Sequence, residues 1–270
     1  SGHTYQNRIN GLKARCAPIQ ISWLGYCNTL GVKNIDYLIA DPHLIKEEEQ
    51  NLYSEKILYM PNIWNALSKP INLPNIENDK EKDIFTYGSF NNFQKISLET
   101  IKLWSKILNE NNSKLILKTS ASFNNEKNKD ILLKKFAKEK VDLKKIIILD
   151  RKISYEEHLA CYNKIDLSLD TFPYPGVTTS FQSLVMGVPV LTMKGFNFNS
   201  RCGESINYNV NSEELIAKNE KEYFDKALNI QKANNINLNY RHALREKVLK
   251  SNLFDIETFT KDFVSLIKSL

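Results

Sequence analysis

One loop of the sequence carries side chains that can hold a phosphate group. Residues 88–95 read GSFNNFQK and end on Lys95, whose ammonium adds a full positive charge, while Asn92 supplies a hydrogen-bond donor. The loop runs into the predicted start of a helix, where free backbone amides and the positive end of the helix dipole favour an anion. A polar turn between a strand and a helix is the alternative interpretation of the same residues.

A second loop, residues 170–179 with the sequence DTFPYPGVTT, follows an apolar stretch and precedes another predicted helix. Two prolines and a glycine restrict its backbone, and Thr178 and Thr179 stand where hydroxyl and amide donors can reach a pyrophosphate. An N-cap pair that ends a rigid turn is the alternative interpretation. Two such loops on neighbouring strands of one sheet indicate a binding site for a nucleotide diphosphate.

Two histidines are further candidates for the same site. His158 lies one helical turn past Ser154 and Tyr155, near the same predicted sheet edge, where an imidazole can hydrogen-bond a base or a ribose. His3, close to the first residue, is the other candidate. The alternatives are a partly buried structural side chain for His158 and an exposed terminal one for His3.

Several common sites are missing from the sequence. It contains neither GxGxxG nor the P-loop pattern, so dinucleotide-cofactor and P-loop NTPase functions lose their main support. The 4 Cys and 4 His are scattered without zinc-ligand spacing, which predicts no metal site and free thiols in a reducing, cytoplasmic compartment. A disulfide framework or a zinc site is the alternative. No signal peptide is found, and no run approaches the ~18 apolar residues of a membrane span.

The elements that must position these loops alternate between strand and helix across the middle of the chain. Apolar, β-branched and aromatic runs predict strands at 83–90, 114–118, 146–149, 165–169 and 188–193. Helical spacing and caps predict helices that begin after Ser97, near 127, at the capping box of Ser154, and near 180. This alternation predicts a parallel sheet covered by helices. The run 146–149, IIIL, does not alternate, and we therefore expect it to be buried on both faces.

The two ends of the chain differ from this pattern. Residues after 211 are predicted to form helices only, and the last helix, at 254–270, has one apolar stripe. Near the start, residues 5–14 are predicted to be helical, and strands are expected at 19–24, 35–40 and 56–60. These strands are about half of a second α/β lobe.

The length of 270 residues fits one large or two ordinary domains. The stretch 62–82, rich in Asn, Pro and Lys, is typical of a linker. We therefore predict a partial amino-terminal lobe with its linker at 1–77. A carboxyl-terminal lobe with the terminal helices is predicted at 78–270.

The net charge of the chain does not by itself indicate that the chain binds an anionic macromolecule. The formal net charge is +6, and the basic residues are mostly lysines placed beside Glu and Asp on predicted helix faces. Such a pattern is typical of a solvated surface. A nucleic-acid binder is the alternative, and it rests on the net charge alone.

Several short motifs, spread in order over nearly the whole chain, resemble the catalytic region of the O-GlcNAc transferase family, glycosyltransferase family 41, including its SPINDLY-type O-fucosyltransferase branch. They are SGHT at 1–4, APIQ at 17–20, WLGY at 23–26, GSFNN at 88–92, KI at 95–96, LDTFPY at 169–174, TT at 178–179 and MGVPV at 186–190.

The resemblance implies an α/β fold of the GT-B type, with a complete carboxyl-terminal Rossmann-like lobe, its parallel sheet, and part of an amino-terminal Rossmann-like lobe. It also implies an inverting, metal-independent transfer of a sugar from a nucleotide diphosphate, UDP-GlcNAc or GDP-fucose, to Ser or Thr hydroxyls of a protein acceptor. Tetratricopeptide repeats usually stand upstream in such proteins.

The resemblance also suggests roles for individual residues. Lys95 matches the lysine that contacts the donor diphosphate, and Thr178 and Thr179 match the pyrophosphate-binding pair. Asn92 falls where some members have a donor-contacting glutamine, and His158 falls on the histidine near the base.

The chain departs from the family pattern around the nucleoside. Val177 stands where O-GlcNAc transferases have histidine, and Tyr155 replaces a lysine near the base. Gln182 replaces the acidic residue that contacts the ribose, and an amide can still accept a hydrogen bond but carries no charge. His3 is the remaining candidate for the proton-transfer step, because the other family residues proposed for it lie mostly upstream.

The leading hypothesis is therefore an inverting glycosyltransferase in which Lys95, the amides of the Thr pair and the helix dipole stabilise the leaving diphosphate. The alternative is a nucleotide-binding module that lacks catalysis because the amino-terminal lobe is incomplete.

Overall fold

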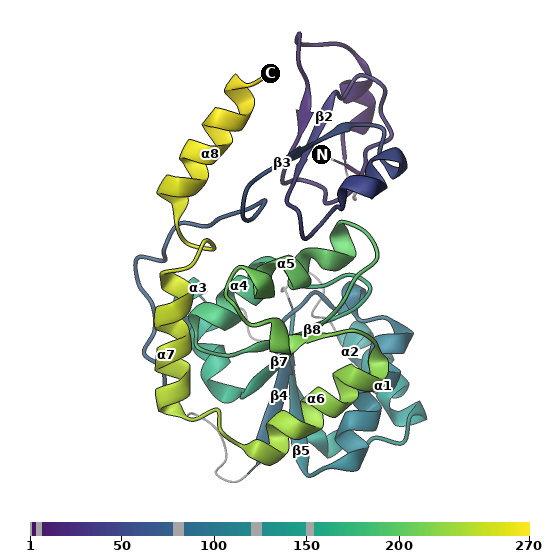
Figure 1. Ribbon diagram of the computed structural model, residues 1–270. Helices are drawn as coiled ribbons and strands as arrows, with labels where there is room; N and C mark the ends of the chain where they lie inside the picture. The colour runs from purple at the N-terminus through teal and green to yellow at the C-terminus, as the bar shows by residue number, and fades with distance from the viewer. Residues whose placement is uncertain (1, 4–6, 78–83, 120–125, 150–153) are drawn as a thin grey trace.

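A parallel sheet forms the centre of the larger lobe in the computed structural model, which describes residues 2–3, 7–77, 84–119, 126–149 and 154–270 (Figure 1). In these residues six strands pair in the order β6-β5-β4-β7-β8-β9, and all their pairings are parallel. The strands are β4 (Phe85–Ser89), β5 (Ser113–Lys118), β6 (Ile146–Leu149), β7 (Leu167–Leu169), β8 (Val190–Met193) and β9 (Ile216–Ala217).

The order of the strands determines where a ligand can bind. Counted within this lobe, the order is 3-2-1-4-5-6, the doubly wound arrangement in which the chain reverses direction across the sheet between the first and fourth strands. Those two strands are β4 and β7, which pair at Tyr87–Leu167 and Gly88–Ser168. A crevice therefore opens at their carboxyl ends, where residues 90–97 and 170–177 follow.

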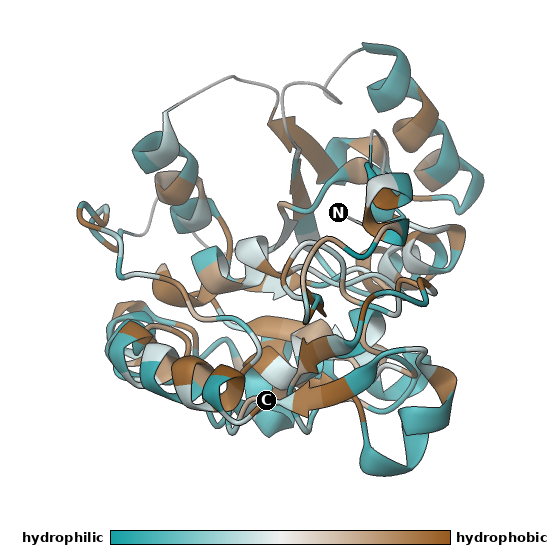
Figure 2. Ribbon diagram, turned by 90° about the horizontal axis from the view of Figure 1, so that it is seen from above, coloured by the Kyte–Doolittle hydropathy of each residue, from teal (hydrophilic) through white to brown (hydrophobic). Residues whose placement is uncertain are grey.

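Helices cover both faces of this sheet, and each face has its own apolar core. One core contains Trp104, Phe136 and Tyr223 from the helices α1, α2 and α6, and the other contains Tyr162 and Phe181 from the opposite side. Figure 2 shows hydrophobic residues concentrated on the strands and mixed residues on the outer helices. The helices are α1 (Leu98–Glu110), α2 (Glu126–Lys138), α3 (Tyr155–Ala160), α4 (Thr178–Val185), α5 (Cys202–Tyr208), α6 (Glu220–Ala233) and α7 (Leu238–Leu249).

Two predicted helix starts are confirmed at the level of single hydrogen bonds. Ser97 caps α1, because its hydroxyl accepts from the Thr100 backbone N–H at 3.0 Å. Ser154 and Glu157 form the expected capping box of α3, with the Glu157 carboxylate accepting from the Ser154 N–H at 2.8 Å. Both helices therefore begin where local sequence places them.

Two predictions about strands are wrong. β6 is not buried on both faces, because it is the edge strand of the sheet, and Ile147 is 37% exposed. A run of isoleucines is compatible with a central strand and with an edge strand. The pattern therefore does not show whether a strand has neighbours on both sides. The chain after residue 211 also contains a strand, β9, whose two residues are too few to produce a periodic pattern.

The smaller lobe is a parallel sheet of β1 (Ile21–Ser22), β2 (Tyr37–Ala40) and β3 (Lys56–Tyr59) in that order. Its predicted strands are confirmed, with shorter bounds. The helix predicted at 5–14 is instead a short 3₁₀ helix, Ile9–Lys13, and part of the predicted range lies outside the described residues. No residue of this 3₁₀ helix is buried, so packing does not extend it into an α-helix.

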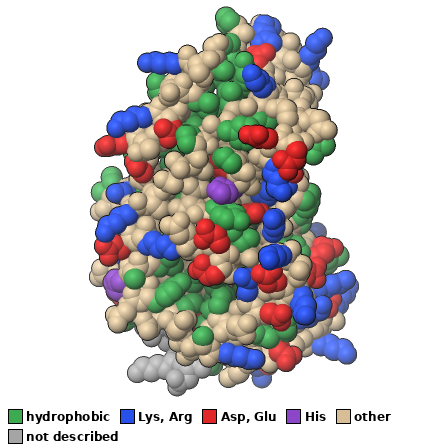
Figure 3. Space-filling view, viewed as in Figure 1, with side chains coloured by type: hydrophobic (Ala, Val, Ile, Leu, Met, Phe, Trp, Pro, Cys, Tyr) green, Lys and Arg blue, Asp and Glu red, His purple; other side chains and the backbone are tan. Residues whose placement is uncertain are grey.

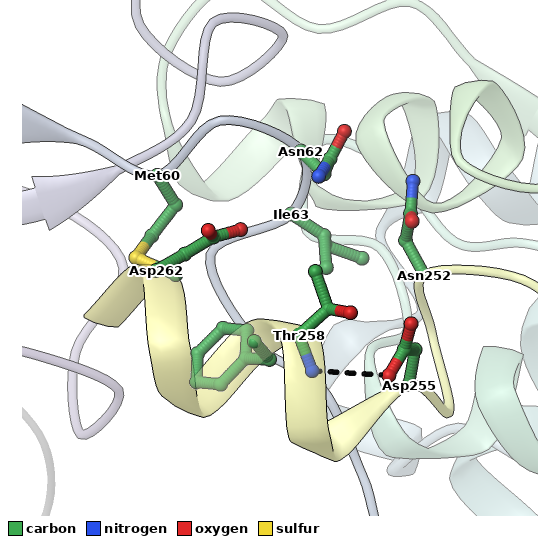
Figure 4. Close-up of a pocket in the computed structure, with 8 residues that line it drawn as sticks. Met60, Asn62, Ile63, Asn252, Asp255, Thr258 and Asp262 are labelled. Carbon is green, nitrogen blue, oxygen red and sulfur yellow. Dashed lines mark hydrogen bonds between the residues drawn. The ribbon is translucent and has the colours of Figure 1, made fainter. Parts of the chain in front are cut away.

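The last helix, α8 (Ile256–Lys268), lies beside the smaller lobe in Figure 1. Its Phe259 and Phe263 rings stand 6.0 and 4.6 Å from the ring of Trp23. Figure 4 shows the start of α8, where Asp255 caps the Thr258 N–H, against Met60 and the residues that follow β3. The predicted boundary groups this helix with the carboxyl-terminal lobe, whereas its aromatic contacts join it to the amino-terminal one.

Candidate functional site

The two loops singled out from the sequence lie side by side. Asn91, directly after β4 and Phe90, donates from its amide to Asp170 Oδ1 at 3.1 Å. Its amide oxygen accepts from the Thr179 hydroxyl at 2.6 Å. One buried asparagine therefore joins the loop after β4 to both ends of the loop after β7, as the adjacent carboxyl ends of these strands allow.

Asp170 organises the second loop from inside. Its carboxylate accepts from the backbone N–H of Gly176 at 2.7 Å and from the hydroxyl of Thr192 at 3.0 Å, besides the bond from Asn91. Burial raises the pKa of Asp170 to about 6, against these hydrogen bonds and the charge of Lys95, all of which lower it. The aspartate thereby fixes the turn that carries the threonine pair.

Lys95 reaches from the first loop into the second. Its ammonium donates to the Pro175 carbonyl at 2.8 Å and lies 4.3 Å from the centre of the Tyr174 ring. Burial lowers the pKa of Lys95, and the nearby Asp170 carboxylate opposes that shift. The sequence places this cation near a helix start, but the structure directs it across the crevice, where it lies beside the threonine loop.

The threonine pair begins α4. Thr178 is exposed, and Thr179 is half-buried with its hydroxyl already donating to Asn91. The N-cap residue Val177 has no side-chain acceptor, and in the described part of the chain no side chain caps the first turn. The first amides of α4 and the positive end of its dipole are therefore the donors that this turn can offer an anion.

Asn92 has a structural bond of its own. Its side-chain oxygen accepts from the Gln94 N–H at 3.0 Å and so caps the 3₁₀ turn Phe93–Lys95. This turn orients Lys95. The amide nitrogen of Asn92 is the part of the side chain that can still meet a ligand, so a donor contact remains a prediction.

His158 and Gln182 are brought together although 24 residues separate them. His158 Nε2 lies 3.1 Å from Gln182 Oε1, and because an amide oxygen only accepts, Nε2 is the donor. Burial lowers the pKa of His158, which keeps the ring neutral. The Nδ1 atom is buried and has no hydrogen-bond partner among the described residues. Tyr155 lies at the start of the same helix and is 57% exposed.

His3 lies in the smaller lobe, where its Nε2 is 3.0 Å from the Leu30 carbonyl oxygen. Its ring meets the Tyr26 ring edge-on at 5.5 Å. Within the part of the chain that the structure describes, His3 makes no hydrogen bond to Lys95 or to the threonine pair.

Directly beneath the crevice, Asn91, Asp170 and Thr179 border a cavity of about 10 Å³, which is too small for any part of a nucleotide. A ligand must therefore lie outside the strand ends. In Figure 3 lysines and arginines are interspersed with acidic residues over the visible face. Among the described residues, no cluster of His, Cys, Asp and Glu could hold a metal ion, and no helix has both the length and the apolar character for a membrane span.

Sequence reasoning overlooked Asn91, Asp170 and Tyr174 as site residues. The sequence does contain a signal for Asp170. A carboxylate directly after an apolar strand needs hydrogen-bond donors from its own loop. Asn91 and Tyr174 carry no such signal. Their roles depend on which strand lies next to β4.

The sequence is similar to a known family over nearly its whole length. The family described as Glycosyl transferase family 41 matches residues 1–68 and 75–263. The "Probable UDP-N-acetylglucosamine--peptide N-acetylglucosaminyltransferase SPINDLY" of Solanum lycopersicum is 34% identical over 281 aligned residues, which cover 100% of this chain and 29% of that protein. The protein with the same description from Hordeum vulgare is also 34% identical, over 100% of this chain and 29% of its own length. The chain thus spans less than a third of these curated relatives.

Solved structures show the same arrangement of lobes. A Thermobaculum terrenum O-GlcNAc transferase mutant superposes with a TM-score of 0.85 at 29% identity, covering 94% of this chain and 48% of the other. The sucrose-phosphate synthase of Thermosynechococcus elongatus superposes at 0.62 with 12% identity, over 88% of this chain and 59% of the other, and shows the fold alone. The architecture is therefore that of the GT-B glycosyltransferases, as predicted.

Proposed function

The chain belongs to glycosyl transferase family 41, and on that premise we propose that it is the donor-binding part of an inverting, metal-independent protein O-glycosyltransferase. The donor is a nucleotide-diphosphate sugar, UDP-GlcNAc or GDP-fucose, and the acceptors are Ser or Thr hydroxyls of proteins. The observation that carries the proposal is the junction of the two loops, where Asn91 bonds both Asp170 and Thr179 and Lys95 lies over the same turn.

In the proposed reaction an acceptor oxygen attacks the anomeric carbon while the bond from that carbon to the diphosphate breaks. Negative charge develops on the departing diphosphate. Lys95 and the first amides of α4 are the groups placed to stabilise it, and preorganised donors of this kind typically contribute about 3 kcal/mol each. Asp170 keeps Lys95 cationic, because its carboxylate opposes the loss of the proton that burial favours.

The nucleoside is proposed to lie over α3 and the start of α4. His158, whose ring lies 6.1 Å from the Phe90 ring at the end of β4, is proposed to lie beside the base or the ribose. The bond from its Nε2 holds Gln182 next to it. Tyr155, Asn92 and Gln182 complete the proposed donor-binding set, and the exposed ring of Tyr155 provides a surface against which a base can stack.

His3 is proposed for the proton-transfer step on its position alone. It lies in the smaller lobe, next to Tyr26. A His3→Asn variant should lose transfer and keep nucleotide affinity. The proposed cytoplasmic location rests on the scattered spacing of the four cysteines in the sequence.

The experiment that tests the proposal combines binding with turnover. Calorimetry with UDP and GDP, together with thermal shifts by UDP-GlcNAc and GDP-fucose, identifies the nucleotide, because a ligand that binds the folded state raises the melting temperature. A transfer assay on the full-length natural protein, with a Ser/Thr-rich peptide, then follows. Nucleotide binding without transfer would favour a non-catalytic nucleotide-binding module, for which the uncharged Gln182 is the supporting feature. The absence of any nucleotide binding would overturn both.

A further inference from the structure

The aromatic ring of Tyr174 meets the ammonium of Lys95, and the proposed function leaves this ring without a role. Lys95 Nζ lies over the ring, 4.3 Å from its centre. Tyr174 is 38% exposed, so packing in an apolar core does not explain its position. The face of an aromatic ring carries negative charge density, which attracts a cation. The ring therefore restrains the end of a long and flexible side chain.

A second contact of Lys95 is with the peptide unit between Pro175 and Gly176. Lys95 Nζ donates to the Pro175 carbonyl at 2.8 Å. The N–H of the same peptide, on Gly176, donates to Asp170 Oδ1 at 2.7 Å. The peptide thus lies between a buried carboxylate and an ammonium, and each hydrogen bond polarises the other. The carbonyl that binds Lys95 is therefore held in place by Asp170.

Two buried threonines fix the loop that carries the ring. The Thr171 hydroxyl donates to the Tyr174 carbonyl at 2.7 Å and closes a four-residue turn. The Thr100 hydroxyl, in α1, donates to the Phe172 carbonyl at 3.0 Å and accepts from the Phe172 N–H at 3.3 Å. Because Thr100 follows Lys95 by only five residues, the segment that carries the cation also anchors the loop that carries the ring.

These contacts leave part of the ammonium available to a ligand. Among the described residues, the Lys95 ammonium makes one hydrogen bond, so two of its three N–H donors remain for phosphate oxygens. A free lysine loses rotamer freedom when it binds an anion. A lysine that is already held in place loses less, and the affinity rises accordingly.

We propose that Tyr174 is a positioning residue, whose ring holds Lys95 where its remaining N–H donors meet the diphosphate of the sugar donor. This inference rests on the proposed function, in which Lys95 binds that diphosphate. Tyr174 acts through Lys95, so its effect on binding depends on the presence of the lysine.

The first measurement needs no ligand. In the full chain with isotope-labelled lysine, the Lys95 Hε protons should resonate upfield of those of exposed lysines, because the face of an aromatic ring shields nearby protons. Lys95→Ala identifies the signal by its loss. Tyr174→Phe should keep the upfield shift, and Tyr174→Leu should abolish it. A wild-type Lys95 signal at the position of exposed lysines would overturn the proposal, even if a variant did not fold.

The second measurement is calorimetry of the full chain with UDP and GDP. Tyr174→Leu should weaken the binding of the nucleotide that wild type binds by roughly 5- to 30-fold, which is the size of a partly desolvated cation–π contact. Tyr174→Phe keeps the ring and should stay within about twofold of wild type. Phe224→Leu, which removes a half-buried ring from the outer helix α6, is the matched control and should bind like wild type.

A double-mutant cycle separates positioning from a general structural effect. Tyr174→Leu should add nothing to the loss of affinity caused by Lys95→Ala, because the ring acts through that lysine. The same weakening factor with and without Lys95→Ala would contradict the proposal. Wild-type affinity in Tyr174→Leu would overturn this inference alone, whereas wild type that binds neither nucleotide would overturn the proposed function together with it.

Discussion

Arg201 of the larger lobe and Glu49 of the smaller lobe form a double hydrogen-bonded ion pair. The two guanidinium nitrogens of Arg201 donate to the two carboxylate oxygens of Glu49 at 2.5 and 2.7 Å. The Arg201 side chain is only 7% exposed, and it also donates to the Leu44 carbonyl at 3.0 Å. Removing Glu49 would leave the Arg201 charge buried without a partner. The contact between the two lobes therefore depends on this ion pair.

We expect Glu49→Gln to lower the free energy of unfolding by about 2 kcal/mol, because it leaves the buried guanidinium without a counter-charge. Urea unfolding measures the effect. The matched control is Glu246→Gln, which breaks an exposed pair with Lys250 whose side chains are 68% and 73% exposed. That change should have a much smaller effect on the free energy of unfolding, because water screens an exposed ion pair. Equal losses of unfolding free energy in the two variants would contradict the conclusion that the buried Arg201–Glu49 pair stabilises the fold more than an exposed pair does.

Lys95→Ala should reduce sugar transfer by at least ~100-fold in the full-length natural protein, since one preorganised donor to the leaving group is lost. Nucleoside diphosphate affinity should fall as well, and calorimetry measures it. Lys138→Ala, on an exposed position of α2, is the control for a general change of charge. Unchanged transfer in the Lys95 variant would exclude its proposed role.

Gln182→Glu should raise the pKa of His158, because a carboxylate would replace the neutral amide oxygen 3.1 Å from Nε2. A titration of the histidine ring protons by NMR measures this change. His43, which stacks on Tyr208, provides the internal control, and its pKa should stay where it is. If the His158 signal titrates as in the wild type, the pair does not exist in solution.

The buried Asp170 should make stability depend on pH in a specific direction. Its pKa is raised to about 6 in the folded chain, against about 3.9 for an unfolded aspartate, so between these values the folded state binds more protons. The stability that this group contributes is fully present below the unfolded pKa, and it is lost as the pH rises through about 6.

The measurement is the free energy of unfolding of wild type and Asp170→Asn between pH 3 and pH 7. The difference, wild type minus variant, should fall as the pH rises. Asp36→Asn is a control of opposite sign, because the hydrogen bond from Arg15 lowers the pKa of Asp36 to about 2. The free energy of unfolding of wild type minus that of Asp36→Asn should fall as the pH is lowered. If the difference for Asp170→Asn does not change with pH, burial does not raise the pKa of this carboxylate.

Local features of the fold could be predicted because the physical causes lie close together in the chain. In the capping box at Ser154 and the cap at Ser97, the hydrogen bonds join residues that are three positions apart in the chain. The residue types at these positions therefore predict where the helices start. The positions of the two loops follow from the strands that precede them. Lys95 and the threonine pair are therefore recognisable as candidates from the order of the residues alone.

The sequence by itself determined the alternation of strands and helices, the caps, and the two loops that follow β4 and β7. The tertiary structure decided that these loops share Asn91 and Asp170, that β6 lies at an edge, and that Arg201 pairs with Glu49. The physical reason is the range of the interactions. Hydrogen bonds within a turn depend on neighbours in the chain, whereas burial, pKa values and contacts between lobes depend on strand order and packing, which local patterns do not specify.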